Sequence, residues 1–568
     1  MGDVPLILVV GGDALAVRVC EELLSTGGHR AALVWPHDHA LAKQLERIGC
    51  DYLPFSPDDY DALRSVGVGE ALSLMALGED DRVNLQVALK ARDINPKIRI
   101  VLRQFNRTLA RKIEQNLPNC SVLSLASHAA ATIVGAALDR SCFSSLQFPD
   151  LDGVLCGFAE RSAKEFGIAG MPFVTAQAHV KMRILAYDGI AEIDPKRKFE
   201  GPERVVVFGE LRYLVATALD AADAPQAPPW NPIATARRLW RNVQHADPVL
   251  RTVIAAAVTV FVCATIAFSF MLHKDPITAA YFVMTTMSTT GYGDITPLEA
   301  GHVPQIFAMI VMVAGVGFSG LAVAFATTAL TRAQWTALQG LRQIRSRGHV
   351  IVCGAGNVGT RVIDFLLMLD QPVVVIDPSP DAEIVELSRT REIQLLTGDA
   401  TRDGTLDLCR LPASRCVIAV TSSDTITLEV ALGARGRNNA LQVVMRVQDE
   451  AFAGSIGRQF EDITTFSTSE LAAPAFAGLS RFPGTRGRIE FGDEDYTVGE
   501  RLQGEVPAPP PAEHCIALGV WRNKAFVHID RFDQMEPYDR LLFIVPLSQF
   551  RGGAPRRERR TVPFANAG

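Results

Sequence analysis

Two long uncharged segments near the middle of this 568-residue chain restrict its fold more than any other feature. Residues 252–272 and 303–330 contain no charged side chain, and each is long enough for a helix that crosses a bilayer, which needs about 20 apolar residues. Backbone outside a helix is tolerated at membrane depth only where it lines a cavity or is buried in protein. The loop between the two segments is therefore predicted to line a pore. Two buried core helices of a soluble protein are the alternative.

The loop carries the sequence Thr289-Thr290-Gly291-Tyr292-Gly293-Asp294. An ion filter needs consecutive backbone carbonyls that replace the water shell of the ion, and alternate glycines permit such a backbone because they tolerate positive φ angles. The loop resembles the potassium channel signature, Thr-Val-Gly-Tyr-Gly followed by Asp, and departs from it at Thr290. The resemblance implies a filter of Thr289, Thr290, Gly291, Tyr292 and Gly293, with K⁺ held by the first four. A glycine-rich surface turn is the alternative.

The segments around the filter predict how it is held and how the chain is oriented. Residues 276–288 are expected to form a pore helix whose carboxyl end aims a partial negative charge at the cavity. Arginines cluster outside the two spans: Arg237, Arg238, Arg241 and Arg251 before the first, and Arg332, Arg342, Arg345 and Arg347 after the second. Basic residues mark the cytoplasmic side, so we expect a cell-membrane protein with two spans and both termini in the cytoplasm. Neither span has regularly spaced arginines, so no voltage sensor is predicted.

Composition narrows the classes of partner. The net charge is −6 and 21% of residues are charged, which does not indicate a nucleic-acid-binding protein. The ten cysteines include no Cys-x-x-Cys pair, so reduced thiols are expected rather than a disulfide framework. The amino terminus has no signal peptide pattern, and residues 4–10 are expected to form a buried strand.

An internal repeat with a constant offset of 343 positions frames the pore. Gly11 corresponds to Gly354, Asp81 to Asp424 and Arg103 to Arg446. Each copy alternates apolar runs with amphipathic helical stretches, which predicts βαβ units and a parallel sheet covered on both faces. In the second copy the expected strands are residues 349–353, 373–376, 393–396, 416–420 and 442–447.

The second copy contains a dinucleotide fingerprint between a strand and a helix. Its residues are Gly354, Gly356, Asn357, Val358 and Gly359, with Asp377 at the end of the next strand and Asp399 after the third. The glycines make the turn, admit a phosphate and pack the helix on the sheet, while Asp377 is placed for ribose hydroxyls. We therefore predict a site for NAD(H) or another adenine nucleotide, with an empty Rossmann-like crevice as the alternative.

The first copy lacks the residues of this fingerprint. Asp13 and Ala16 stand where the second and third glycines belong, and the second strand ends at Trp35-Pro36 without an acid. A carboxylate beside a phosphate repels it, so this copy is expected to be a structural partner without a bound dinucleotide.

The two copies resemble RCK domains (regulators of K⁺ conductance) over residues 4–135 and 348–480. The resemblance rests on the fingerprint, on Gly398-Asp399-Ala400 and on the strand that ends Met445-Arg446. It implies a membrane α-helical pore domain combined with two α/β Rossmann-like RCK domains, each with a small α+β C-terminal lobe. It also implies a cytoplasmic ring that pulls on the pore helices and a homotetramer. Calcium-gated relatives place acids at the later strand ends, and Arg446 is unfavourable for Ca²⁺, so calcium is disfavoured there.

These inferences divide the chain into eight parts. They are 1–140 and 141–222 (first RCK domain and lobe), 223–248 (linker), 249–331 (pore), 332–347 (gating linker), 348–480 and 481–548 (second RCK domain and lobe) and 549–568 (basic tail). Gly315, Gly317 and Gly320 in the second span suggest a gating hinge, and close helix packing through small residues explains them equally well.

Three other functions remain open. A membrane-tethered dehydrogenase would explain the fingerprint, but no acid, base or nucleophile pair lies near it, so we expect no enzymatic activity. An NAD-dependent regulatory protein would leave the filter unexplained. A less selective cation channel is compatible with Thr290, with Tyr281-Phe282 in place of aromatics that include Trp, and with Thr285 in place of a buried Glu.

Overall fold

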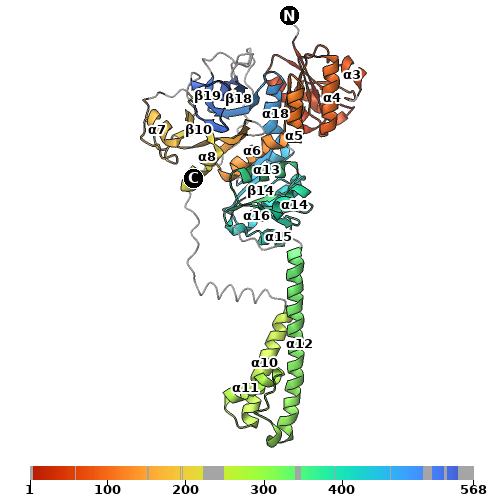
Figure 1. Ribbon diagram of the computed structural model, residues 1–568, viewed down its shortest axis with the longest axis vertical. Helices are drawn as coiled ribbons and strands as arrows, with labels where there is room; N and C mark the ends of the chain where they lie inside the picture. The colour runs from red at the N-terminus through yellow and green to blue at the C-terminus, as the bar shows by residue number, and fades with distance from the viewer. Residues whose placement is uncertain are drawn as a thin grey trace. The chain divides into compact units, whose positions relative to one another are not determined.

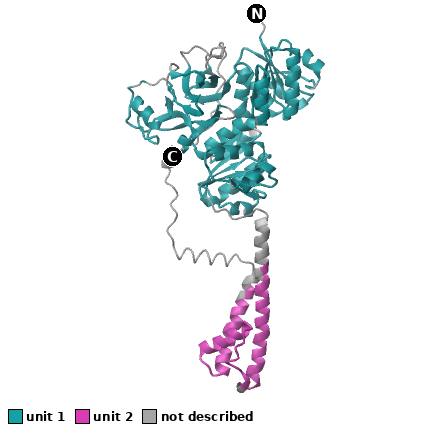
Figure 2. Ribbon diagram, viewed as in Figure 1, with its two compact units in different colours: residues 1–223, 343–568 teal, residues 224–342 magenta. Residues whose placement is uncertain are grey.

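The computed structural model describes residues 4–221, 248–338, 347–502 and 515–547, apart from short gaps at 58, 150–152, 192–193, 195, 391, 449, 461 and 530–533. The chain forms two compact units (Figure 2). Unit 1 comprises residues 1–223 and 343–568, and unit 2 comprises residues 224–342. Residues 222–247 and 339–346, which belong to the two expected linkers, and the expected basic tail from 551 lie outside the described residues.

Unit 2 is a small helical bundle (Figure 1). Its helices are α10 (Pro248–Met271), α11 (Pro276–Met287), the short 3₁₀ turn η1 (Leu298–Ala300) and α12 (His302–Leu338). Phe268 of α10 lies at the centre, 4.9 Å from the ring of Phe282 on α11 and 5.1 Å from that of Phe307 on α12. The long apolar side chains of the outer faces remain exposed, as in proteins covered by lipid or by another copy.

One helix among the described residues is long and apolar enough to cross a membrane. It is the His302–Ala324 part of α12, while Ala255–Met271 of α10 is a shorter apolar helix. α12 continues to Leu338, beyond the uncharged segment that ends at residue 330. The expected gating linker at 332–347 therefore begins as helix.

Unit 1 contains two parallel sheets with the same strand order, as the repeat predicts. The first has the order β3-β2-β1-β4-β5-β6 and the second β13-β12-β11-β14-β15-β16. The first sheet is built from β1 (Leu6–Val10), β2 (Arg30–Val34), β3 (Asp51–Leu53), β4 (Ser73–Ala76), β5 (Arg99–Arg103) and β6 (Cys120–Leu123). Its helices are α1 (Ala14–Ser25), α2 (His39–Ile48), α3 (Tyr60–Ser65), α4 (Asp81–Ile94), α5 (Arg107–Asn116) and α6 (Leu125–Leu138).

The second sheet follows the expected strands closely. It is built from β11 (His349–Cys353), β12 (Val373–Asp377), β13 (Ile393–Thr397), β14 (Ser414–Ala419), β15 (Gln442–Val447) and β16 (Ile463–Ser467). Its helices are α13 (Asn357–Met368), α14 (Ala382–Arg389), α15 (Asp403–Leu408), α16 (Asp424–Arg437), α17 (Glu450–Gln459) and α18 (Thr468–Leu479), with η2 (Leu411–Ala413) before β14. β14 starts two residues earlier than expected. β16 was not predicted, because an edge strand with two threonines lacks a continuous apolar run.

A small antiparallel sheet follows each parallel sheet. The first lobe contains β7 (Cys142–Phe148), β8 (Val154–Ser162), β9 (Arg183–Tyr187) and β10 (Arg204–Glu210) with α7 (Phe173–Val180) and α8 (Leu211–Ala221). The second lobe contains β17 (Thr485–Phe491), β18 (Glu494–Leu502), β19 (Ile516–Arg522), β20 (Ala525–Val527) and β21 (Arg540–Pro546). The two lobes share one apolar cluster, in which Phe208 meets Phe526 at 5.8 Å between ring centroids.

The two copies exchange their last helices. α6 follows the first sheet but packs against α13, β14 and β15 of the second copy (Figure 1). Arg415 donates to the Leu138 carbonyl at 2.7 Å, and the Gln442 amide donates to the Ala136 carbonyl. In the reciprocal contact α18 packs against α1, and Arg481 donates to the Leu23 carbonyl at 2.9 Å. Each copy therefore contributes a helix to the core of the other.

Candidate functional site

The pore helix α11 is fixed at both ends by hydrogen bonds. Asp275 caps its amino end by accepting from the Thr278 amide at 3.1 Å and from the Thr278 hydroxyl at 2.7 Å. At its carboxyl end the Thr285 carbonyl accepts from the amides of Thr290 and Gly291 at 3.0 and 3.2 Å. The carbonyl end of the helix thus holds the first residues of the glycine loop directly.

Residues with positive φ alternate along the loop with residues that lack it. Thr289 has a φ of 61°, Gly291 of 52° and Gly293 of 75°, whereas Thr290 and Tyr292 do not have positive φ. Successive carbonyls of an extended strand point to opposite sides, and an alternation of left-handed with right-handed residues brings them toward one side. This is the backbone that a row of carbonyl ligands for a dehydrated cation requires. Thr289 is the non-glycine member of the set, and a β-branched residue in that conformation is unusual.

Side chains of the loop are held by α11. The rings of Tyr281 and Tyr292 are parallel, with an interplanar angle of 2° and centroids 6.4 Å apart. Thr290, the departure from the potassium channel signature, forms a hydroxyl–hydroxyl hydrogen bond of 2.9 Å with Ser288. Tyr281 on the pore helix therefore braces the loop through Tyr292.

The three glycines of α12 have different surroundings. A methyl group at Gly315 would lie 2.6 Å from the Met287 Cα, so Gly315 permits close packing of α12 on the end of the pore helix. Gly317 and Gly320 have nothing within 4 Å of such a methyl group, and α12 runs through all three without interruption. The packing interpretation therefore accounts for Gly315, while a hinge at Gly317 and Gly320 stays a prediction.

The glycine loop of the second copy has the geometry that its fingerprint predicts. Gly354 has a φ of 99°, and a methyl group there would meet the Val420 carbonyl at 2.9 Å. At Gly359 a methyl group would lie 2.0 Å from the Gly354 carbonyl, so α13 can approach the strand only with glycine. Nothing lies within 4 Å of a methyl group built on Gly356, where a phosphate would approach. Asn357 is exposed at the start of α13, and Val358 is buried beneath it.

Two acids lie at the carboxyl edge of the same sheet. Asp377 accepts from the Ala355 amide at 2.7 Å and from the Ser379 amide at 2.8 Å, so it fixes the glycine loop. An ionised carboxylate has about four acceptor sites, which leaves capacity for sugar hydroxyls. Asp399 accepts from the amide and hydroxyl of Thr401 at 3.0 and 2.8 Å, and these bonds lower its pKa.

The corresponding crevice of the first copy is filled by the protein. A methyl group at Gly12 would lie 2.3 Å from the Trp35 indole nitrogen, so the indole covers the backbone that a phosphate would contact. Asp13 caps α1 through the Ala16 amide at 3.1 Å and forms an ion pair with Arg103. Together, the indole and the ion pair occupy the space that Gly356 leaves open in the second copy.

Comparison with known proteins matches three parts of the chain to two family models. The TrkA-N domain model matches residues 7–118 and 350–463, and the ion channel model matches residues 249–332. The chain carries two TrkA-N domains and one ion channel domain. Its domain composition is that of a potassium channel with RCK domains, and it is a membrane protein.

Individual relatives are distant. Potassium channel protein 1 of Methanocaldococcus jannaschii is 27% identical over 181 residues, which are 31% of this chain and 53% of that protein. The calcium-gated potassium channel TvoK of Thermoplasma volcanium is 26% identical over 188 residues, which are 31% of this chain and 52% of that protein. The matches span about half the length of these relatives. The solved GsuK channel aligns with 97% of this chain and 78% of its own, with a TM-score of 0.50 and 14% identity, which shows the fold.

One contact near the crevice was not foreseen. Phe105 follows β5 of the first copy, yet its ring lies 5.3 Å below the guanidinium of Arg361, which is on α13 of the second copy. Arg361 also pairs with Asp364 at 2.8 Å. The helix that begins at the nucleotide crevice is thus covered by a residue from the other copy. Such a contact leaves no local sequence pattern.

Proposed function

We propose that this chain is the subunit of a homotetrameric potassium channel in the cell membrane, with two spans and cytoplasmic termini. The observation that carries the proposal is the alternation of positive φ at Thr289, Gly291 and Gly293 at the end of a short helix between two long ones. Four such loops around an axis would supply rings of carbonyl oxygens for K⁺. Two of the relatives are named as potassium channels, which supports K⁺ as the permeant ion.

The reversal potential of the reconstituted channel in mixed K⁺ and Na⁺ tests this proposal. Selectivity for K⁺ should place the reversal potential near the K⁺ equilibrium value. A reversal potential near zero under the same gradients would favour the less selective cation channel, in which the Thr290 hydroxyl and its Ser288 partner alter the filter.

We also propose that an adenine nucleotide such as NAD(H) binds in the second copy and shifts the pore equilibrium. Support comes from the open backbone at Gly356, the amide-anchored Asp377 and the start of α13, whose positive end favours phosphate. Trp35 and the Asp13–Arg103 pair occupy the equivalent space in the first copy. Titration calorimetry should therefore give about one nucleotide per chain, and two equivalent sites would contradict the assignment.

The proposal includes neither catalysis nor calcium at the later strand ends. Arg446 is the penultimate residue of β15 and donates to the Thr421 carbonyl at 3.3 Å, which places a cation where calcium would need acids. No cluster of three or more metal-binding side chains occurs among the residues that the structure describes. Incubation with NADH should produce no oxidation, and Ca²⁺ should leave nucleotide binding unchanged.

A further inference from the structure

The constant offset of 343 positions allows the two crevices to be compared residue by residue. Arg103 is the last residue of β5, and its equivalent Arg446 lies near the end of β15. Asp13 precedes α1, and its equivalent Gly356 precedes α13. The two copies thus carry the same basic residue at the same strand end, but they differ in the residue at the start of the helix.

In the first copy the arginine has a carboxylate partner. Arg103 forms an ion pair with Asp13 and donates to the Leu77 carbonyl, just after β4, at 3.1 Å. The start of a helix after the first strand is where a Rossmann fold holds a phosphate group. In the first copy, therefore, a carboxylate of the protein stands at the phosphate position and neutralises the arginine.

In the second copy the equivalent arginine has no such partner. Arg446 donates to the Thr421 carbonyl at 3.3 Å. This bond keeps the guanidinium beside the glycine loop, because a methyl group on Gly354 would lie 3.0 Å from the Thr421 Cα. Among the residues that the structure describes, Arg446 forms no ion pair, and its buried Nε has no hydrogen-bond partner. A guanidinium stays protonated near pH 7, so its charge has no counter-ion at this point.

The nearest acid does not take the place of the missing partner. Asp424 accepts from the Gln448 amide with both oxygens, at 2.9 and 3.0 Å. In the first copy the equivalent Asp81 accepts in the same way from the Phe105 amide, at 3.2 and 3.0 Å. The two acids have one role in both copies, so the difference between the copies comes from the residue before the helix.

The space that Asp13 fills in the first copy is open in the second. Nothing lies within 4 Å of a methyl group built on Gly356, and no side chain caps α13 there. Burial lowers the pKa of Arg446, Asp424 offsets part of this effect, and the charge of Arg103 lowers the pKa further. The second copy therefore combines an open helix start with a cation that a bound anion would stabilise.

We propose that Arg446 binds a phosphate group of the nucleotide in the second copy, and that the Asp13 carboxylate in the first copy is an internal substitute for that phosphate. The inference rests on the nucleotide site proposed above and specifies its ligand as phosphorylated, because an uncharged nucleoside would leave Arg446 unpaired. Guanidinium groups bind phosphate through parallel N–H bonds, and the Nε–H of Arg446 is available for one of them.

Titration calorimetry of the full-length protein with ADP and with adenosine tests the role of the arginine. Arg446→Gln should weaken ADP binding about tenfold to hundredfold, the range for a hydrogen bond to a charged group. Adenosine should bind weakly and equally to both proteins, since it has no phosphate. Arg446→Lys keeps the charge and should recover part of the affinity for ADP.

Arg437→Gln is the matched control. Arg437 lies in the last turn of α16, at the opposite edge of the sheet, and pairs with Asp407 at 2.8 Å. This variant should keep the affinity of the unmodified protein for ADP. Binding of ADP that Arg446→Gln leaves unchanged, or an equal loss in Arg437→Gln, would overturn the role of Arg446 alone. Failure of the unmodified protein to bind both ADP and NAD⁺ would overturn the nucleotide site itself.

A second measurement needs no ligand and tests the internal substitute directly. Gly356 has a φ of −72° and open surroundings, so Gly356→Asp and Gly356→Asn introduce neither backbone strain nor a clash. Both side chains cap a helix equally well, and only the aspartate carries a charge. Gly356→Asp should therefore unfold at a higher temperature than Gly356→Asn, and it should bind ADP more weakly.

The same pair of variants in an Arg446→Gln background completes a double-mutant cycle. The difference between the two midpoints should shrink there, because the partner of the new carboxylate is gone and only the effect of the helix end remains. Equal differences in the two backgrounds would show that the carboxylate does not reach Arg446, and they would overturn the proposal.

Discussion

Replacement of Gly291 by alanine tests the filter assignment, and the backbone of the loop allows the cost in free energy to be estimated. Gly291 has a φ of 52°, and nothing lies within 4 Å of a methyl group built on it. The change therefore introduces backbone strain and no clash within the chain. An L-residue in the left-handed region costs about 1–2 kcal/mol. In a fourfold pore the four strained residues would disfavour the conducting backbone by about 4–8 kcal/mol, which is a thousandfold or more.

The helical bundle should survive the same change. About 1–2 kcal/mol per chain is small beside the about 5–15 kcal/mol that stabilises a typical domain. Gly291→Ala should therefore abolish K⁺ flux into proteoliposomes while size-exclusion chromatography shows an unchanged assembly.

Gly301 offers a matched control close by. It has a φ of 95° and the same empty surroundings, but it lies after η1 and outside the filter. Gly301 combines its positive φ with a ψ of 178°, a region that is essentially restricted to glycine, so Gly301→Ala should impose at least as much strain and still leave K⁺ selectivity intact. Unchanged K⁺ flux in Gly291→Ala, or an equal loss in Gly301→Ala, would refute the assignment of the carbonyl row to this loop.

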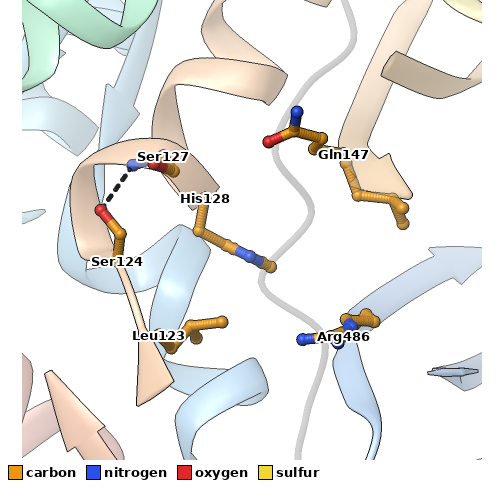
Figure 3. A pocket seen from close by; sticks show the side chains of 7 residues that line it. Leu123, Ser124, Ser127, His128, Gln147 and Arg486 are labelled. Atoms are coloured by element: carbon orange, nitrogen blue, oxygen red, sulfur yellow. Dashed lines mark hydrogen bonds between the residues drawn. The ribbon is translucent and has the colours of Figure 1, made fainter. Parts of the chain in front are cut away.

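Three further predictions concern unit 1 and its link to the pore. Gly356→Val should fill the open phosphate position and weaken nucleotide binding at least tenfold, as measured by calorimetry. Asp377→Ala should weaken nucleotide binding as well. Binding that neither change affects would contradict the assignment of the site. Because the pKa of His128, whose ring points from α6 toward Arg486 (Figure 3), is about 4 in the folded chain against 6.5 when unfolded, its protonation favours unfolding, and stability should fall by about 3 kcal/mol in total as the pH drops from 6.5 to 4. His128→Gln should flatten this part of the pH profile of the thermal midpoint and the exposed His37→Gln should not; identical profiles would show that His128 does not titrate in this range. A flexible insertion within residues 338–346 should leave nucleotide binding intact and remove its effect on open probability in single-channel recordings, and equal modulation would exclude coupling through this segment.

The sequence predicts local features of this chain well. Glycine positions could be assigned because each has a local reason: Gly354 needs positive φ, and Gly359 needs close approach of helix and strand. The constant offset of the repeat predicts two sheets of the same strand order, which the structure confirms. The two TrkA-N domains and the ion channel domain are likewise confirmed by the family comparison.

Contacts between distant segments could not be predicted. Nothing in the composition of α6 indicates which sheet it covers, because twelve of its residues are buried and it lacks the one-sided apolar stripe that would fix a face. The contact of Trp35 with Gly12 could not be predicted either. The missing glycines show that the first crevice is degenerate, but not that an indole from the next strand fills it.

The exchanged helix α6 provides a physical route between the nucleotide crevice and the lobes. α13 starts at the glycine loop and packs along α6, whose small side chains allow close approach; Ala129 and Ala130, for example, are fully buried. At its other face α6 packs on β7, where a methyl group at Gly135 would lie 2.2 Å from the Ser145 hydroxyl. A helix packed this tightly on both faces cannot absorb a displacement of α13 by local rearrangement, because protein interiors are close-packed. If the nucleotide proposed for the second copy moves α13, then α6 moves with it and displaces the first lobe. The crevice and the first lobe are thus connected through one helix, by which a ligand in one copy would change the arrangement of both.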